Sequence, residues 1–167
     1  VLLRRQGRDC FLRIAGYLSP AQEKFLEGLK NYLRQPATQG HFEIVGEVSR
    51  NGKIEFLQSL DVLSVPTIYR EAKGLYVLES MACGVPVVQP RHGSFPELID
   101  ATGGGLLFDP AGGPEALAQA LGLLLDHAEE RREMGARGMR AVRTSFTDRV
   151  MADKTWELYE RCLACPK

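Results

Sequence analysis

The chain has 167 residues, of which 44% are hydrophobic and 25% are charged, which is typical of one soluble globular domain over residues 1–167. Lysine plus arginine equals aspartate plus glutamate, at 21 each, so the charge argues against a nucleic-acid partner and against a strongly basic membrane-binding face. No apolar run approaches the roughly 20 residues that a membrane-spanning helix needs.

Apolar runs and helical spacing predict strands that alternate with helices. The first nine residues are typical of a helix end that closes on Gly7. Strands are predicted at residues 11–16, 42–48, 62–65, 85–89 and 105–108. Helices are predicted at residues 20–34 and 53–60, from about Gly74 onward, and in a helical tail over about 114–165 that includes 131–144 and 150–162. This alternation favours an α/β fold with parallel strands and crossover helices.

Two glutamates, Glu71 and Glu79, are separated by seven residues where a predicted strand gives way to a helix. In open α/β sheets, ligands bind beyond the carboxyl ends of the strands, and the free N–H groups at a helix start favour phosphate. Carboxylates repel phosphate but accept hydrogen bonds from hydroxyl groups, such as those of a vicinal diol. The pattern therefore predicts a ligand that carries both phosphate and sugar.

A long ordered motif continues from this pair. Glu79 is followed by Ser-Met-Ala-Cys-Gly-Val-Pro-Val-Val, and Gly93 opens the sequence Gly-Ser-Phe-Pro-Glu. With these motifs the chain, from about residue 11 to 159, resembles the retaining glycosyltransferases of family 4 (glycosyl transferases group 1), which have the GT-B fold. It departs from their pattern at three small residues, Thr67, Ser80 and Ser94.

The resemblance implies the C-terminal, donor-binding domain of a GT-B enzyme, a Rossmann-like parallel sheet with helices on both faces. In relatives, the first strand of this domain ends in a glycine-rich turn whose Arg and Lys hold the donor's diphosphate, and the match begins after that strand. We therefore expect a fragment that lacks this strand and the N-terminal, acceptor-binding domain. We expect no transfer activity from the chain alone.

The resemblance also implies a role for each residue of the motif. Glu71 is expected near the transferred hexose, as the catalytic carboxylate, and Glu79 is expected on the 2′ and 3′ hydroxyls of the ribose. Main-chain contacts to the diphosphate are expected from Gly74, Leu75 and Tyr76. Contacts to the base are expected from Gly46, Glu47 and Val48, and contacts to the donor sugar from Gly93 and Ser94. The side chains of Leu75 and Leu78 are expected in the core.

The implied reaction is transfer of a hexosyl group from a nucleotide-diphosphate sugar to an acceptor hydroxyl, in glycan, glycolipid or polysaccharide synthesis, with the anomeric configuration retained. Neither a metal nor another cofactor is expected, and the chain contains no Asp-Xaa-Asp sequence. Two alternatives remain open. One is an epimerase-like GT-B enzyme that acts on a sugar nucleotide, and the other is a non-catalytic nucleotide-binding or interaction domain.

The cysteines and histidines are interpreted as ordinary residues. The cysteines are scattered along the chain, which suits the reduced thiols of a cytoplasmic protein; they are Cys10, Cys83, Cys162 and Cys165. The last two have the spacing of a redox or metal pair, but no second pair accompanies them. Solvated surface positions, in turns or at helix ends, are expected for the histidines, His41, His92 and His127.

Overall fold

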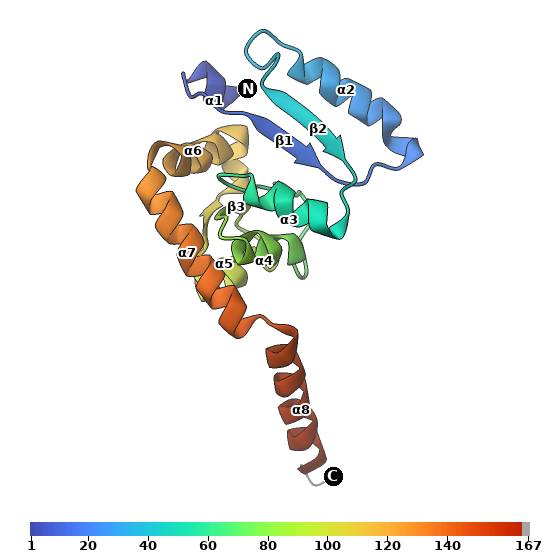
Figure 1. Ribbon diagram of the computed structural model, residues 1–167, viewed down its shortest axis with the longest axis vertical. Coiled ribbons are helices and arrows are strands. Elements are labelled where there is room, and N and C mark those ends of the chain that lie inside the picture. Colours follow the sequence, from blue (N-terminus) through green and yellow to red (C-terminus); the bar gives the residue numbers. More distant parts are fainter. Residues whose placement is uncertain (165–167) are drawn as a thin grey trace.

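The computed structural model describes residues 1–164 and shows parallel strands that alternate with helices (Figure 1). The strands are β1 (Leu12–Ala15), β2 (Phe42–Gly46), β3 (Val87–Pro90) and β4 (Gly105–Phe108). The helices are α1 (Leu2–Arg5), α2 (Glu23–Leu33), α3 (Arg50–Gln58), α4 (Leu75–Ala82), α5 (Phe95–Thr102), α6 (Gly113–Asp126), α7 (Ala128–Ser145) and α8 (Asp148–Ala164), with 3-10 turns at Pro20–Gln22 and Pro110–Gly112. The predicted helical tail is confirmed as far as Ala164; residue 165 lies outside the described residues.

The strands pair in parallel, as predicted, in two sheets of two strands each. In the first sheet Leu12 of β1 lies opposite Phe42 of β2, and in the second Val87 of β3 lies opposite Gly105 of β4. The α/β class with parallel strands is therefore confirmed.

The strand predicted at residues 62–65 is instead an extended segment that pairs through one residue only, so that prediction is wrong in detail. Leu63 forms a single parallel bridge with Val87. The Leu63 N–H donates to the Pro86 carbonyl at 3.0 Å, and the Val88 N–H donates to the Leu63 carbonyl at 2.9 Å.

The ladder stops after this bridge for reasons that lie in the side chains. The next acceptor in a parallel register, the Val88 carbonyl, accepts from the Ser64 hydroxyl at 2.7 Å. The next donor would be residue 90, which is Pro90 and has no N–H. The Val65 N–H turns instead to the side-chain Oε1 of Gln89, at 3.3 Å.

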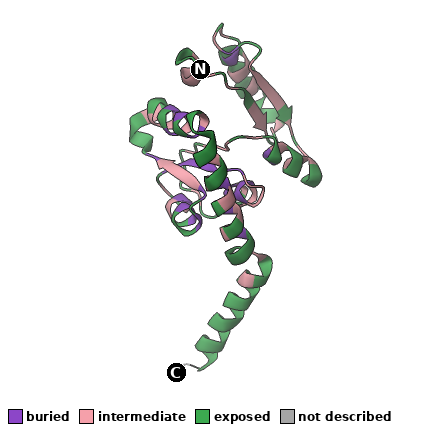
Figure 2. Ribbon diagram, turned by 60° about the vertical axis from the view of Figure 1, so that its left-hand side comes forward, coloured by how far each residue is buried: buried purple, intermediate pink, exposed green. Residues whose placement is uncertain are grey.

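Helices cover both faces of the second sheet, as predicted. Neighbouring residues of a strand point to opposite faces, and Val87 and Val88 accordingly enter different clusters. Val87 packs with buried residues of α4, α5 and α7, namely Val77, Met81, Phe95, Leu98, Ile99 and Val142. Val88 packs with Phe108 of β4 and with Ala120 and Leu124 of α6. Figure 2 shows that buried residues concentrate in this part of the molecule.

The last helix, α8, extends away from the rest of the molecule (Figure 1) and contains no buried residue. Two of its aromatic side chains, Trp156 and Tyr159, are among the exposed large hydrophobic residues. Between residues 1 and 164, no helix combines the length and the apolar character needed to cross a membrane.

Close packing of α7 depends on a glycine, and this generates a prediction about stability. A Cβ on Gly138 would lie 2.9 Å from the Cα of Gly104 and 3.2 Å from the Cγ of Met81. We expect Gly138→Ala to lower the free energy of unfolding by about 1–3 kcal/mol. The new Cβ would meet the backbone of Gly104, just before β4, and backbone moves less easily than a flexible side chain. Urea unfolding monitored by circular dichroism measures the change.

Gly28→Ala in α2 is the matched control, since a Cβ at Gly28 meets nothing within 4 Å. There the substitution removes flexibility from the unfolded chain and should raise stability by about 0.4–1 kcal/mol. Equal effects of the two substitutions would contradict the packing argument.

Candidate functional site

The two loops that the sequence assigns to the site, around Glu71 and at Gly93–Ser94, pack closely together because Gly93 has no side chain. Gly93 has φ +59, and a Cβ on it would lie 2.5 Å from the carbonyl oxygen and 2.7 Å from the nitrogen of Glu71. No side chain fits this space. The N–H of Ser94 donates to the same Glu71 carbonyl at 2.8 Å. The structure thus brings the Glu71 loop and the Gly93–Ser94 loop into direct contact.

The start of α4 lies beside these loops. Gly74, the N-cap residue, has φ +62, and a Cβ on it would lie 3.2 Å from the Leu98 Cδ1 and 3.6 Å from the Ser94 hydroxyl. The first N–H that bonds inside the helix is that of Val77, to the Gly74 carbonyl at 2.9 Å. The N–H groups of Leu75 and Tyr76 precede this bond, so no carbonyl of the helix accepts from them. Such N–H groups, at the positive end of a helix dipole, favour an anion.

Glu71 turns its carboxylate toward its own loop. Its Oε1 accepts the N–H of Lys73 at 3.1 Å. Hydrogen bonds from backbone N–H groups, first that of Lys73 and then that of Gly74, hold the pKa of Glu71 below its ordinary value. The carboxylate is therefore ionised at neutral pH and lies against the N–H groups that lead into α4.

Glu79, one turn into α4, forms an ion pair that sequence reasoning missed. Its Oε1 lies 2.5 Å from the Nζ of Lys53 in α3, and both side chains are partly exposed, at 41% and 42% respectively. A lysine near the start of a helix opposes the helix dipole, which is the one sequence signal that could have drawn attention to Lys53.

The predicted base-binding segment connects to Glu79 through α3. β2 ends at Gly46, and Glu47 and Val48 lead directly to the N-cap residue Ser49, whose hydroxyl accepts the Gly52 N–H at 3.1 Å. α3 then carries Lys53 to Glu79. Segments from the carboxyl end of β2 and from α4 are in this way joined by one helix.

Polar atoms without partners gather around the Glu71 loop. Within residues 1–164, the buried side-chain polar atoms that lack a hydrogen-bond partner are Tyr76 Oη, Gln89 Nε2, His92 Nδ1 and Ser94 Oγ. All belong to the first turn of α4 or to the stretch from the end of β3 to the start of α5. Buried unpaired polar groups are rare in folded proteins, and functional sites are one of the places that retain them.

Two sequence-based expectations are wrong at this site. His92 is not a solvated surface residue: its Nε2 lies 3.0 Å from the Thr67 carbonyl oxygen, and its ring centroid lies 5.9 Å from that of Phe95. Leu75, the first residue of α4, is 61% exposed rather than in the core. Leu78, in contrast, packs against the core as predicted.

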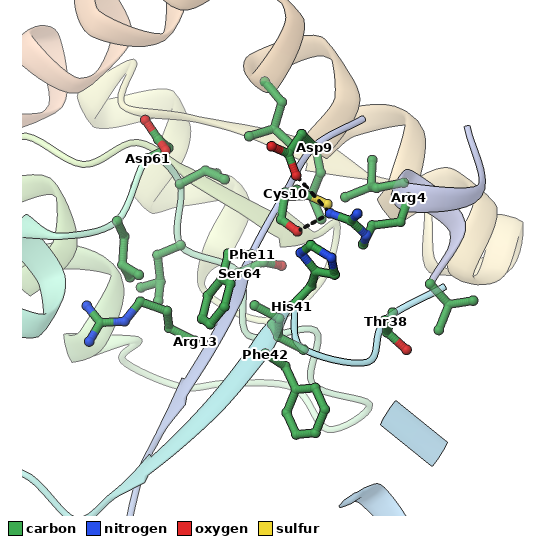
Figure 3. A pocket seen from close by; sticks show the side chains of 18 of the residues that line it. Arg4, Asp9, Cys10, Phe11, Arg13, Thr38, His41, Phe42, Asp61 and Ser64 are labelled. Atoms are coloured by element: carbon green, nitrogen blue, oxygen red, sulfur yellow. Dashed lines mark hydrogen bonds and ion pairs between the residues drawn. The ribbon is translucent and has the colours of Figure 1, made fainter. Parts of the chain in front are cut away.

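A cavity of about 550 Å³ lies elsewhere, beside β1 and the start of β2 (Figure 3). β1 and the start of β2 line one side, residues 59–64 line the other, and Leu121 and Leu125 of α6 also contribute. His41 lines this cavity, whereas none of the residues predicted to bind the donor does. The cavity is therefore separate from the candidate site.

In the part of the chain that the structure describes, no three His, Cys, Asp or Glu residues are grouped to hold a metal ion. Cys10, Cys83 and Cys162 are free thiols, and Cys165 lies outside the described residues.

The Tyr76 hydroxyl gives a prediction about pH. Burial, and then the negative charge of Glu71, raise the pKa of Tyr76 to about 12, against about 10 for an unfolded tyrosine. Its contribution to stability is therefore complete below about pH 10 and is lost as the pH rises toward the folded pKa. We expect Tyr76→Phe to lose less stability than the parent chain between about pH 10 and pH 12.

At neutral pH the same substitution should be close to neutral, because it removes no hydrogen bond. Thermal unfolding across the pH range measures both effects. Tyr32→Phe, at an exposed tyrosine of α2, is the control, and an identical pH profile for the two variants would contradict the assignment.

Comparisons with known proteins identify the family of the chain. Residues 1–141 match the family described as glycosyl transferases group 1. The chain is 36% identical over 109 residues to the MMP alpha-(1->4)-mannosyltransferase of Mycolicibacterium hassiacum, covering 65% of this chain and 26% of the relative. It is 36% identical over 121 residues to the phosphatidyl-myo-inositol mannosyltransferase of Mycobacterium leprae, covering 72% and 32% respectively. The chain therefore spans about a third or less of the length of these relatives.

Solved structures share the fold. The sucrose-phosphate synthase of Thermosynechococcus elongatus matches with a TM-score of 0.80 and 27% identity, over 98% of this chain and 41% of that one. The C-terminal domain of a glycosyl transferase group 1 protein from Francisella tularensis matches with a TM-score of 0.75 and 22% identity, over 88% and 75%. HepE of Anabaena, solved in complex with UDP, matches with a TM-score of 0.81 and 16% identity, over 91% and 41%.

The family match covers more than half of the chain, and the fold superposes on the sucrose-phosphate synthase over 98% of the chain. The chain belongs to the glycosyl transferases group 1 family and has the α/β fold of a GT-B C-terminal domain.

Proposed function

We propose that this chain is the donor-binding domain of a retaining glycosyltransferase, which moves a hexosyl group from a nucleotide-diphosphate sugar to an acceptor hydroxyl. The observation that carries the proposal is the arrangement around the start of α4, where Glu71 and the Gly93–Ser94 loop lie beside free helix N–H groups and Glu79 follows one turn into the helix. Family membership supports glycosyl transfer. The complexes of HepE with UDP and with UDP-glucose support a sugar nucleotide as the donor class.

In this proposal the diphosphate binds at the N–H groups of Leu75 and Tyr76, where the dipole of α4 favours negative charge. Glu79 accepts hydrogen bonds from the 2′ and 3′ hydroxyls of the ribose. The base rests on the main chain of residues 46–48, the segment that leads into α3. The diphosphate, the ribose and the base of the nucleotide thus each have a group in the chain whose chemistry suits it.

Glu71 serves the sugar. Its lowered pKa keeps the carboxylate ionised, so it acts as an acceptor for hexose hydroxyls or offsets positive charge that develops at the anomeric carbon. The main chain of Gly93 and Ser94, held against Glu71, approaches the same sugar. Because the Glu71 carboxylate lies against N–H groups that favour an anion, it moves away from part of that surface when a sugar nucleotide binds.

The chemistry that this chain contributes is stabilisation of the leaving group. Negative charge builds on the diphosphate as the glycosidic bond breaks, and fixed N–H donors stabilise that charge because they need no reorganisation. We propose that the acceptor binds to another part of the protein, so that the chain alone binds the donor without transferring the sugar. Free thiols in an ordinary composition support a cytoplasmic enzyme.

The role of Glu79 is tested by Glu79→Gln. We expect the dissociation constant of the bound nucleoside diphosphate to rise about tenfold, because hydrogen bonds from the diol to a charged acceptor are lost. Ligand-observed NMR with UDP, GDP and ADP measures binding and identifies the base. Glu115→Gln, at an exposed glutamate in the first turn of α6, is the control. Unchanged affinity in Glu79→Gln would remove the assigned role.

The contact between Gly93 and Glu71 gives a second test. Gly93→Ala should weaken binding of the sugar nucleotide more than binding of the matching nucleoside diphosphate, because the loops that approach the sugar must separate. UDP-glucose, GDP-mannose and ADP-glucose, each compared with its diphosphate in the same NMR experiment, provide the measurement. We expect a loss of stability of about 1–3 kcal/mol as well.

Gly7→Ala separates backbone strain from contact in this test. Gly7 has φ +84, but a Cβ there meets nothing within 4 Å. The Gly7→Ala variant should therefore lose stability through backbone strain alone and bind all ligands as the parent chain does. Equal weakening of sugar nucleotide and diphosphate by Gly93→Ala would contradict a role of this loop in sugar binding.

A further inference from the structure

The ion pair between Lys53 and Glu79 is the only one, among the ion pairs found within residues 1–164, that includes a residue predicted to bind the donor. It joins α3 to α4 across 26 positions of sequence. Both side chains remain about two-fifths exposed, so a ligand can reach the pair. Exposed ion pairs add little to folding stability. We therefore examine what this pair does for the binding of a ligand.

The contact leaves much of the Glu79 carboxylate free. Lys53 contacts Oε1, and a carboxylate has about four lone-pair positions on its two oxygens. A ligand with two neighbouring hydroxyl groups can therefore bind while the ammonium remains in place. The ammonium limits the orientations that Glu79 can adopt, and a carboxylate already oriented loses less entropy when a ligand binds.

The positive charge of Lys53 also reduces the repulsion between Glu79 and the diphosphate of a bound nucleotide. A carboxylate that binds ribose hydroxyls lies near the diphosphate of the same nucleotide, and the two negative charges repel each other. Lys53, placed on Glu79, offsets this repulsion. Its position one turn into α3, just after the segment 46–48, also ties the segment proposed for the base to the residue proposed for the ribose.

We propose that Lys53 is a donor-positioning residue: it orients and neutralises Glu79 so that this carboxylate can bind the ribose diol of a nucleoside diphosphate. The inference rests on the proposed function, because it assigns a partner to one residue of that site. It adds a residue from a different helix, which the motif around Glu71 and Glu79 does not include.

The test uses the full chain and compares UDP, GDP and ADP with their 2′,3′-dideoxy counterparts by ligand-observed NMR titration. Lys53→Met removes the charge, Lys53→Arg keeps it, and Lys24→Met, at an exposed lysine of α2, is the matched control. We expect Lys53→Met to weaken the ribonucleotide about five- to tenfold and the dideoxy nucleotide less than about twofold. Lys53→Arg and Lys24→Met should bind like the parent chain.

The double variant with Glu79→Gln completes the design. If Lys53 acts through Glu79, Lys53→Met should add no further loss to Glu79→Gln. Thermal unfolding of each variant checks that the fold is intact. Equal weakening of the ribo and dideoxy forms, or no weakening, would overturn the inference while leaving the proposed function in place. If the parent chain binds none of the nucleotides, the proposed function fails first and this inference fails with it.

Discussion

The close approach of Gly93 to the backbone of Glu71 is the constraint on which the site depends. With 2.5 Å between a hypothetical Cβ and the Glu71 carbonyl oxygen, only glycine allows the loop after β3 to touch the loop before α4. That contact places the Ser94 hydroxyl beside Gly74 and sets the start of α4 against the start of α5. The Glu71 carboxylate, the free N–H groups of α4 and the Gly93–Ser94 main chain share one region because of it.

Charge in this region is arranged in opposing pairs. The Glu71 carboxylate lies on backbone N–H groups, and the Glu79 carboxylate lies on the ammonium of Lys53. Each carboxylate therefore has a positively charged or N–H partner within the protein. In the proposed function, phosphate takes the N–H groups at the start of α4, and hydroxyl groups bind the Glu79 carboxylate while Lys53 remains in place. The nearby unpaired atoms, such as Tyr76 Oη, have no comparable partner within the described residues.

The sheet supports the site through a small number of backbone bonds. The segment that leads to Glu71 is tied to β3 by the Leu63 bridge, after which Pro90 has no N–H with which to continue the ladder. Beyond that point the Ser64 hydroxyl and the Gln89 side chain make the bonds that a longer strand would have made. The two segments stay side by side as far as the contact between Glu71 and the Gly93–Ser94 loop.

Local patterns in the sequence determined most of the elements of this protein and its family. The strand at 105–108 and the helices of the tail follow from apolar periodicity, which needs only near neighbours. The glutamate pair and the motif after it led to the glycosyl transferases group 1 family, which the comparison confirms. The pairing of Lys53 with Glu79, the contact of His92 with the Thr67 carbonyl and the reduction of residues 62–65 to a single bridge were decided only by the tertiary structure. Each depends on residues about two dozen or more positions apart, whose proximity results from packing of the whole chain rather than from any local propensity.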